Sequence, residues 1–149
     1  MSRYHRQFYI DAPLESVWTL IRDPRRHTEW WPQAVEVRGE RFEEGDEYVQ
    51  VSRVALGIQQ TTPHAIDRLE DLHEIQVTCQ TTGRYARWVV TEARGGTFVD
   101  AEMGLEPSSF GFRLLDQTAG RYYLNRWLAE AVDGLRAAAE AERPSRHHI

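Results

Sequence analysis

Lysine is missing from this chain, and cysteine is nearly missing. All 18 residues counted as lysine or arginine are arginine, and Cys79 is the only cysteine. Without lysine, neither a Schiff base nor a Ser-Lys nucleophile pair can form. A single cysteine rules out an intrachain disulfide, and a cysteine-built zinc site is not expected. A glycine-rich phosphate loop and a Gly-x-Ser-x-Gly elbow are also missing, so several enzyme classes are excluded.

Long apolar runs are absent as well. No run approaches the ~20 residues of a membrane span, and residues 1–10 are too polar for a secretory signal core. The net charge is −5, and no extended basic face for nucleic acid is evident. The 149 residues suit one domain. We therefore expect a single cytoplasmic domain over residues 1–149, with no membrane span and no nucleic-acid partner; the oligomeric state stays open.

The N-terminal third predicts one strand and two short helices. Alternating apolar residues predict a strand over residues 4–10. Pro13 suits the start of a helix, whose apolar stripe is Leu14, Val17, Trp18 and Ile21. Asp23-Pro24 ends this helix, because the residue before proline avoids the α region. Asp23 can then cap a second short helix over residues 24–29.

The rest of the chain predicts strands followed by one long helix. The strands are expected near residues 34–42, 47–56, 60–69, 73–81, 84–93 and 97–106. The helix runs from about Arg121 to Glu142, and residues 143–149 are expected to fray. Residues 110–118 are either the first turns of this helix or a separate lid.

Two glycine-containing turns suggest a register for the later strands. If Gly95-Gly96 is a two-residue turn, Trp88 lies opposite Met103; if Thr82-Gly83 is one, Val77 lies opposite Trp88. Both turns place the same apolar set on one face: Ile75, Val77, Cys79, Ala86, Trp88, Val90, Ala101, Met103 and Leu105.

The two preceding strands add polar side chains to this face. Opposing Ile66 to Ile75 puts His64 beside Val77 and Thr62 beside Cys79, both pointing inward. For residues 47–56 the alternation leaves two inner faces open. One is Tyr48, Gln50 and Ser52, and the other is Val49, Val51 and Arg53.

Several motifs occur in a characteristic order: Ile10-Asp11-Ala12-Pro13, Val17-Trp18, Asp23-Pro24, Trp30-Trp31-Pro32, Gly95-Gly96-Thr97 and an alanine-rich last helix. From about Tyr4 to Glu142 this order resembles the START-like (SRPBCC) superfamily, which includes the birch-pollen-allergen fold and polyketide cyclase/dehydrase-like proteins. The resemblance implies an α+β helix-grip fold. In that fold a curved antiparallel sheet of about seven strands surrounds the long C-terminal helix, and two short helices lie between strands 1 and 2.

The same resemblance implies a function. Members of the superfamily carry lipids, sterols, plant hormones and aromatic metabolites, and some cyclise or dehydrate polyketides. We therefore expect binding or transport of a small hydrophobic molecule, a lipid or an aromatic metabolite, in an internal cavity and without a cofactor. One alternative is a polyketide aromatase/cyclase or dehydratase. Another is a ligand-dependent regulatory partner in which residues 107–118 act as a lid.

His64 is the candidate catalytic residue, because a pKa near neutrality suits acid–base chemistry. Its alternative role is a hydrogen-bonded structural histidine. An inward Arg126 would hold a carboxylate or enolate, whereas an outward one would be solvated. The histidines show no convergent metal spacing, so no metal site is expected. The candidate ligand-binding residues are Trp30, Trp31, Thr62, His64, Val77, Trp88, Met103, Tyr122 and Arg126.

Overall fold

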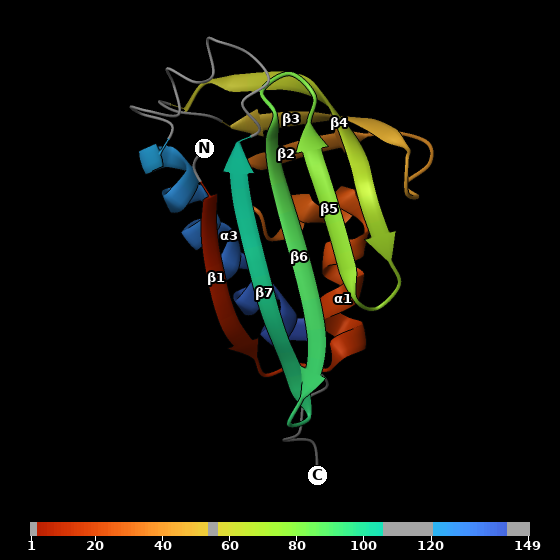
Figure 1. Cartoon of the computed structure of the whole chain (residues 1–149), viewed down its shortest axis with the longest axis vertical. Helices are drawn as coiled ribbons and strands as arrows, with labels where there is room; N and C mark the ends of the chain where they lie inside the picture. The colour runs from red at the N-terminus through yellow and green to blue at the C-terminus, as the bar shows by residue number, and fades with distance from the viewer. Residues whose placement is uncertain (1–2, 54–56, 106–120, 143–149) are drawn as a thin grey trace.

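A curved antiparallel sheet covers one side of a long helix in the computed structural model, which describes residues 3–53, 57–105 and 121–142 (Figure 1). Within these residues the sheet has seven strands in the order β1-β7-β6-β5-β4-β3-β2. The strands are β1 (Arg3–Ile10), β2 (Ala34–Arg38), β3 (Glu47–Arg53), β4 (Gln59–Glu70), β5 (Glu74–Cys79), β6 (Arg84–Ala93) and β7 (Gly96–Leu105). The predicted helix-grip class is confirmed.

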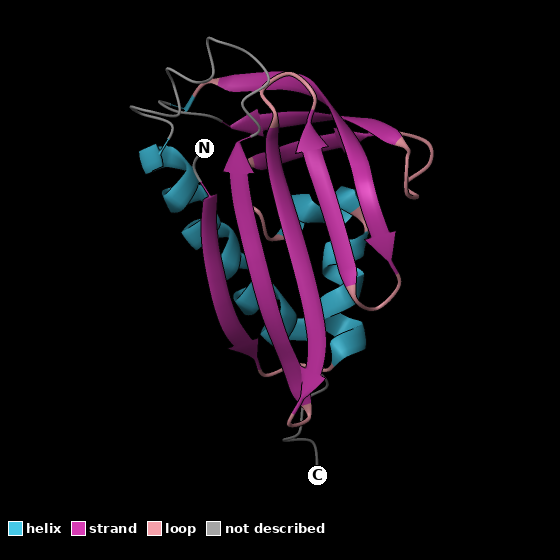
Figure 2. Ribbon diagram, in the orientation of Figure 1, coloured by secondary structure: helices cyan, strands magenta, loops and turns pink. Residues whose placement is uncertain are grey.

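The helices of the described residues lie behind the same face of this sheet (Figure 2). They are α1 (Leu14–Arg22), the 3-10 helix η1 (Pro24–Glu29) and α3 (Arg121–Glu142). The predicted cap of the second helix is confirmed, since an Asp23 carboxylate oxygen accepts a hydrogen bond from the Arg25 backbone nitrogen at 3.0 Å. None of the described helices is both long enough and apolar enough to cross a membrane.

The predicted hairpin registers are each wrong by two residues. Ala93 pairs with Gly96, so the β6–β7 turn consists of Arg94 and Gly95, with φ of 53° and 80°. Two positive φ values match the twist of a tight hairpin, and this moves the turn back by one residue. In the β5–β6 hairpin Val77 pairs with Ala86, because four residues, 80–83, connect the strands.

The predicted inner face is nevertheless confirmed. Side chains alternate with a period of two, so a slip of two residues leaves every side chain on its original side. All nine apolar residues predicted for this face are buried. The slip therefore changed cross-strand neighbours and left the composition of the core as predicted.

β3 and β4 supply the polar part of the inner face. The face left open by the sequence is the one with Tyr48, Gln50 and Ser52, all of them buried. Thr62 and His64 also point inward, as predicted. However, His64 lies opposite Cys79 instead of Val77, and β4 carries an irregularity between Ile66 and Arg68.

The long helix α3 packs its apolar stripe against the sheet and α1. Its buried residues are Leu124, Leu128, Ala131, Val132, Leu135 and Ala139, and Ala138 is partly buried beside them. Gly134 allows α3 to pass very close to the chain after η1, since a Cβ atom there would lie 1.9 Å from the Trp30 carbonyl oxygen. The predicted segment 110–118 and the tail 143–149 lie outside the described residues.

Candidate functional site

Three tryptophans from distant parts of the chain meet beneath the sheet. Trp30 and Trp31 are stacked with ring centroids 5.6 Å apart, and Trp88 meets them edge-on at 5.2 and 6.0 Å. The Trp30 indole nitrogen donates to the Leu20 carbonyl at 2.9 Å, which fixes this ring in the core. Trp31 donates to the Gln33 side chain at 2.7 Å.

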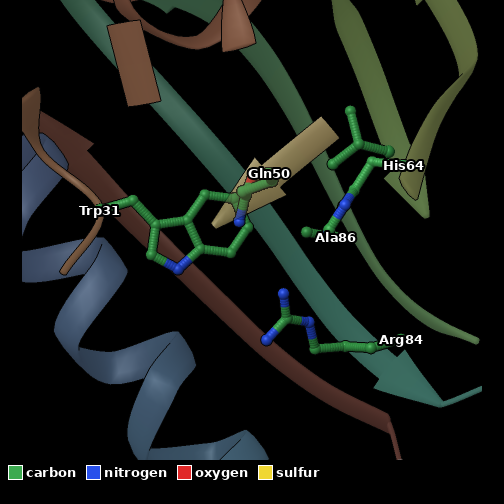
Figure 3. A pocket seen from close by; sticks show the side chains of 6 residues that line it. Trp31, Gln50, His64, Arg84 and Ala86 are labelled. Atoms are coloured by element: carbon green, nitrogen blue, oxygen red, sulfur yellow. The ribbon is translucent and has the colours of Figure 1, made fainter. Parts of the chain in front are cut away.

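Trp31 also forms one wall of an internal pocket. The pocket is lined by Trp31, Gln50, His64, Val77, Arg84 and Ala86 (Figure 3). The free volume of this pocket is about 10 Å³, which is enough for about one water molecule. As the described residues form it, the pocket is thus smaller and more polar than the internal cavity for a hydrophobic molecule that the sequence predicts.

His64 faces this pocket with one nitrogen free. Its side chain is only 2% exposed and stacks on Tyr48, with ring centroids 5.4 Å apart. Nδ1 lies 3.2 Å from the Thr62 carbonyl oxygen. Because a carbonyl oxygen only accepts, the proton of the neutral ring is assigned to Nδ1. Nε2 is buried and has no hydrogen-bond partner in the part of the chain that the structure describes.

Burial keeps His64 neutral at neutral pH. Loss of hydration, with a smaller contribution from the nearby positive charge of Arg84, lowers the pKa of His64 to about 4. The hydrogen bond to Thr62 opposes this shift without cancelling it. The pocket therefore presents a neutral acceptor nitrogen beside a positive charge.

That charge comes from Arg84, which the sequence analysis did not select. Arg84 begins β6, and its guanidinium carbon lies 5.3 Å from the ring centroid of Trp127 on α3. Burial lowers the pKa of Arg84, and the groups whose charges oppose this are Cys79 and Tyr48. An arginine remains charged even so. The sequence did contain a signal, since Arg84 shares the alternation of Ala86 and Trp88.

Cys79 and Tyr48 complete the polar surroundings. Burial acts to raise the pKa of the Cys79 thiol, but hydrogen bonds with Thr82 and Thr62 and the charge of Arg84 lower it overall. Burial raises the pKa of Tyr48, whose hydroxyl has no partner among the described residues. Both groups lie on the inner face next to His64, since His64 pairs with Tyr48 on one side and Cys79 on the other.

Comparison with known proteins identifies the family. Residues 1–140 match the sequence model described as polyketide cyclase / dehydrase and lipid transport. The chain belongs to this family. The predicted resemblance to the SRPBCC superfamily is thereby confirmed. No protein with a curated description matches the sequence significantly.

Solved structures agree with this family's fold. A Bacillus halodurans protein is 16% identical, with a TM-score of 0.74 over 94% of this chain and 98% of its own. A Thermus thermophilus protein is 20% identical, with a TM-score of 0.69 over 94% and 98% of the two chains. An AHSA1-like protein from Aeromonas hydrophila is 18% identical, with a TM-score of 0.68 over 99% of both chains. At these identities the likeness concerns the fold alone.

Within this family fold, the predicted site residues fall into separate places. Val77, Trp31 and His64 line the pocket, and the carbonyl of Thr62 orients His64. Trp30, Trp88 and Met103 are buried in the core cluster instead.

The two candidates on the last helix do not join the pocket lining. Arg126 is exposed on α3 and pairs with Glu130 at 3.5 Å. Of the two orientations that the sequence left open for Arg126, the structure has the outward one, because position 126 lies opposite the buried stripe of Leu124 and Leu128. The side chain of Tyr122 lies outside the described part of the chain.

A second hollow lies outside the sheet's interior, next to η1 and β2. It has a volume of about 380 Å³ and is lined by Thr28, Glu29, Trp30, Trp31, Pro32, Ala34, Val35 and Arg53. Because Trp31 lines both hollows, this residue stands between the outer groove and the internal pocket.

One group of potential metal ligands lies at the β4–β5 turn. Donor atoms of Glu70, His73 and Glu74 lie within 4.8 Å of one another. Glu74 already accepts a hydrogen bond from Arg87 at 2.6 Å. A cation there would compete with the guanidinium for this carboxylate, so the cluster gives no reason to replace the expectation of no metal site.

Proposed function

We propose that this chain binds a small, largely apolar molecule between the inner face of the sheet and α3, with the polar end of the guest in the internal pocket. The observation that carries this proposal is the Nε2 of His64, which has no hydrogen-bond partner among the described residues and lies beside the Arg84 guanidinium. The rest of the pocket wall consists of Gln50 and the apolar side chains of Trp31, Val77 and Ala86. A buried polar atom without a partner costs free energy. A guest that supplies the missing partner recovers that cost.

The narrow pocket requires side chains to move when a guest enters. The open space of about 10 Å³ is far smaller than an aromatic ring system. Gln50 and Arg84 have long side chains that can change rotamer, whereas the sheet backbone is fixed by its ladders. We propose that a guest enters past Trp31, which separates the pocket from the outer groove.

The cyclase or dehydratase alternative depends on His64 as the acid–base residue. Its free Nε2 supports that role, but a pKa of about 4 makes it a weak base at neutral pH. General bases work best when the pKa lies near the operating pH. This argument favours binding over acid–base catalysis.

Pocket filling tests the binding proposal. We expect native mass spectrometry of the purified protein to detect a retained guest, and N-phenyl-1-naphthylamine to fluoresce when added. Ala86→Leu fills the pocket and should abolish both signals. Val89→Leu, on the opposite face of β6, is the matched control and should retain them. Equal binding by wild-type protein and Ala86→Leu, with both folded by circular dichroism, would contradict the proposed site.

A further inference from the structure

We propose that the pocket selects guests by their head group, namely an ionised oxygen with a hydroxyl group beside it. In this assignment the Arg84 guanidinium binds the oxyanion and His64 Nε2 accepts the hydroxyl hydrogen. The inference deepens the proposed function and rests on it. It adds the chemical class of the guest, an aromatic hydroxy-carboxylate or the enolate of a hydroxy-carbonyl compound.

The first argument is that Arg84 has no carboxylate partner among the described residues. Arg87, three residues along β6 and on the other face, donates to the buried Glu74 carboxylate at 2.6 Å. Within the described residues no carboxylate lies within ion-pair distance of Arg84, and its charge interacts with Cys79 and Tyr48. A guanidinium in such surroundings binds an oxyanion strongly, because its donors match two oxygens at once.

The second argument is the fixed tautomer of His64. The Thr62 carbonyl accepts a hydrogen bond from Nδ1–H, so Nε2 offers only a lone pair to the pocket. Burial and the Arg84 charge both oppose protonation of the ring, so this acceptor persists through the neutral pH range. An acceptor next to an oxyanion site fits a hydroxyl hydrogen and repels a second anionic oxygen.

The third argument is the shape of the remaining wall. Trp31 offers a flat apolar face, and Val77 and Ala86 are apolar. Planar ring systems pack well on such a face. The Trp31 ring and the side chains of His64 and Arg84 surround one space in Figure 3. This arrangement fits a flat guest with adjacent acidic and hydroxyl oxygens.

A series of naphthalene compounds tests this head-group assignment by titration calorimetry at pH 7.5. We expect 3-hydroxy-2-naphthoate to bind more tightly than 2-naphthoate, and 2-naphthoate at least tenfold more tightly than its neutral methyl ester. A charge-assisted hydrogen bond of ~1.5–3 kcal/mol corresponds to about 10- to 150-fold.

Variants then assign each contact. Arg84→Gln should remove the preference for the acids while changing affinity for the ester less than about threefold. His64→Leu should remove only the advantage of the added hydroxyl. Arg87→Gln is the matched control on the outer face and should leave all affinities unchanged. If Arg84→Gln fails to fold, Arg84→Lys keeps the charge and should retain a weakened preference for the acids.

The outcomes separate the two proposals. Binding of the ester as tightly as the acids, or equal loss of all compounds in Arg84→Gln, overturns the head-group assignment and leaves the binding function standing. Failure of every compound and of N-phenyl-1-naphthylamine overturns both.

Discussion

Two buried histidines, His27 and His64, make the free energy of unfolding depend on pH. His27 is fully buried in η1, donates from Nε2 to the Ile21 carbonyl at 2.7 Å, and leaves Nδ1 without a partner among the described residues. Burial lowers the pKa of each ring to about 4. An unfolded histidine titrates near ~6.5. Stability is therefore complete above about pH 6.5 and falls as pH decreases toward 4, because the unfolded chain binds protons first.

We expect His27→Gln to remove about half of this pH dependence. Glutamine can still donate to Ile21 but takes up no proton in this range. Each histidine contributes on the order of 3 kcal/mol of destabilisation by pH 4. Urea unfolding at pH 7.5, 6 and 5 measures the slope. Thr28→Ala, the exposed neighbour, should keep the wild-type slope. An unchanged slope in His27→Gln would show that this ring does not resist protonation.

Single residues of the site were partly predictable. Strict alternation along β4 predicts an inward His64, and the structure agrees. Arg84 follows the same rule on β6, yet arginine is so often solvated that its alternation carries little weight. Arg126 was selected from the sequence but is exposed. It lies two residues from both Leu124 and Leu128, and on a helix this spacing places it opposite their buried stripe. The sequence alone could have shown this.

At the level of elements, the crossing of α3 over the end of η1 depends on Gly134. We expect Gly134→Ala to destabilise the protein by about 3 kcal/mol, because the new methyl group would overlap the Trp30 carbonyl. Helix propensity alone favours alanine by about 1 kcal/mol, so the sign of the effect tests the contact. Chemical denaturation measures it, and the exposed Asp133→Ala is the control. A more stable Gly134→Ala protein would contradict this close approach.

At the β6–β7 turn we expect a substitution to stabilise the protein. Arg94 adopts a left-handed conformation, with φ of 53°, which costs most residues about 1 kcal/mol and asparagine less. We expect Arg94→Asn to raise the free energy of unfolding by about 0.5 kcal/mol. The Tyr9 hydroxyl still finds its acceptor, since it donates to the Arg94 backbone carbonyl. A loss of stability would mean that the arginine side chain contributes more than the strain it tolerates.

The elements were more predictable than their registers. Alternation and Asp23-Pro24 are local signals, and they located the strands and short helices closely. Turn length depends on backbone conformations that several sequences can adopt. Gly95-Gly96 offered two adjacent places for one turn, and the twist of the strands selected Arg94-Gly95.

For the whole molecule, the topology predicts slow folding. β1 pairs with β7, so residues such as Phe8 and Val99, which lie far apart in the sequence, must come together as cross-strand neighbours. Such non-local pairing slows folding to the range of ~1 ms to seconds. Stopped-flow refolding followed by tryptophan fluorescence measures this rate. Refolding within microseconds would contradict the importance of the β1–β7 pairing.

The overall architecture follows from consistency across many weak signals, because each strand, cap and stripe favours the same arrangement. The site cannot be predicted from such local signals. Its pocket joins Trp31 from the segment after η1 with Gln50, His64 and Arg84 from three strands. Only the curvature of the sheet brings them together, and curvature leaves no simple pattern in a sequence.

The pairing of the first strand with the last has a consequence during synthesis. On the ribosome β1 emerges before β7, which is completed only when Leu105 has left the exit tunnel. Until then the nascent chain holds β1 without its sheet neighbour. An unpaired strand can associate with other chains, so the interval of translation between the two strands is when β1 is most open to pairing with another chain.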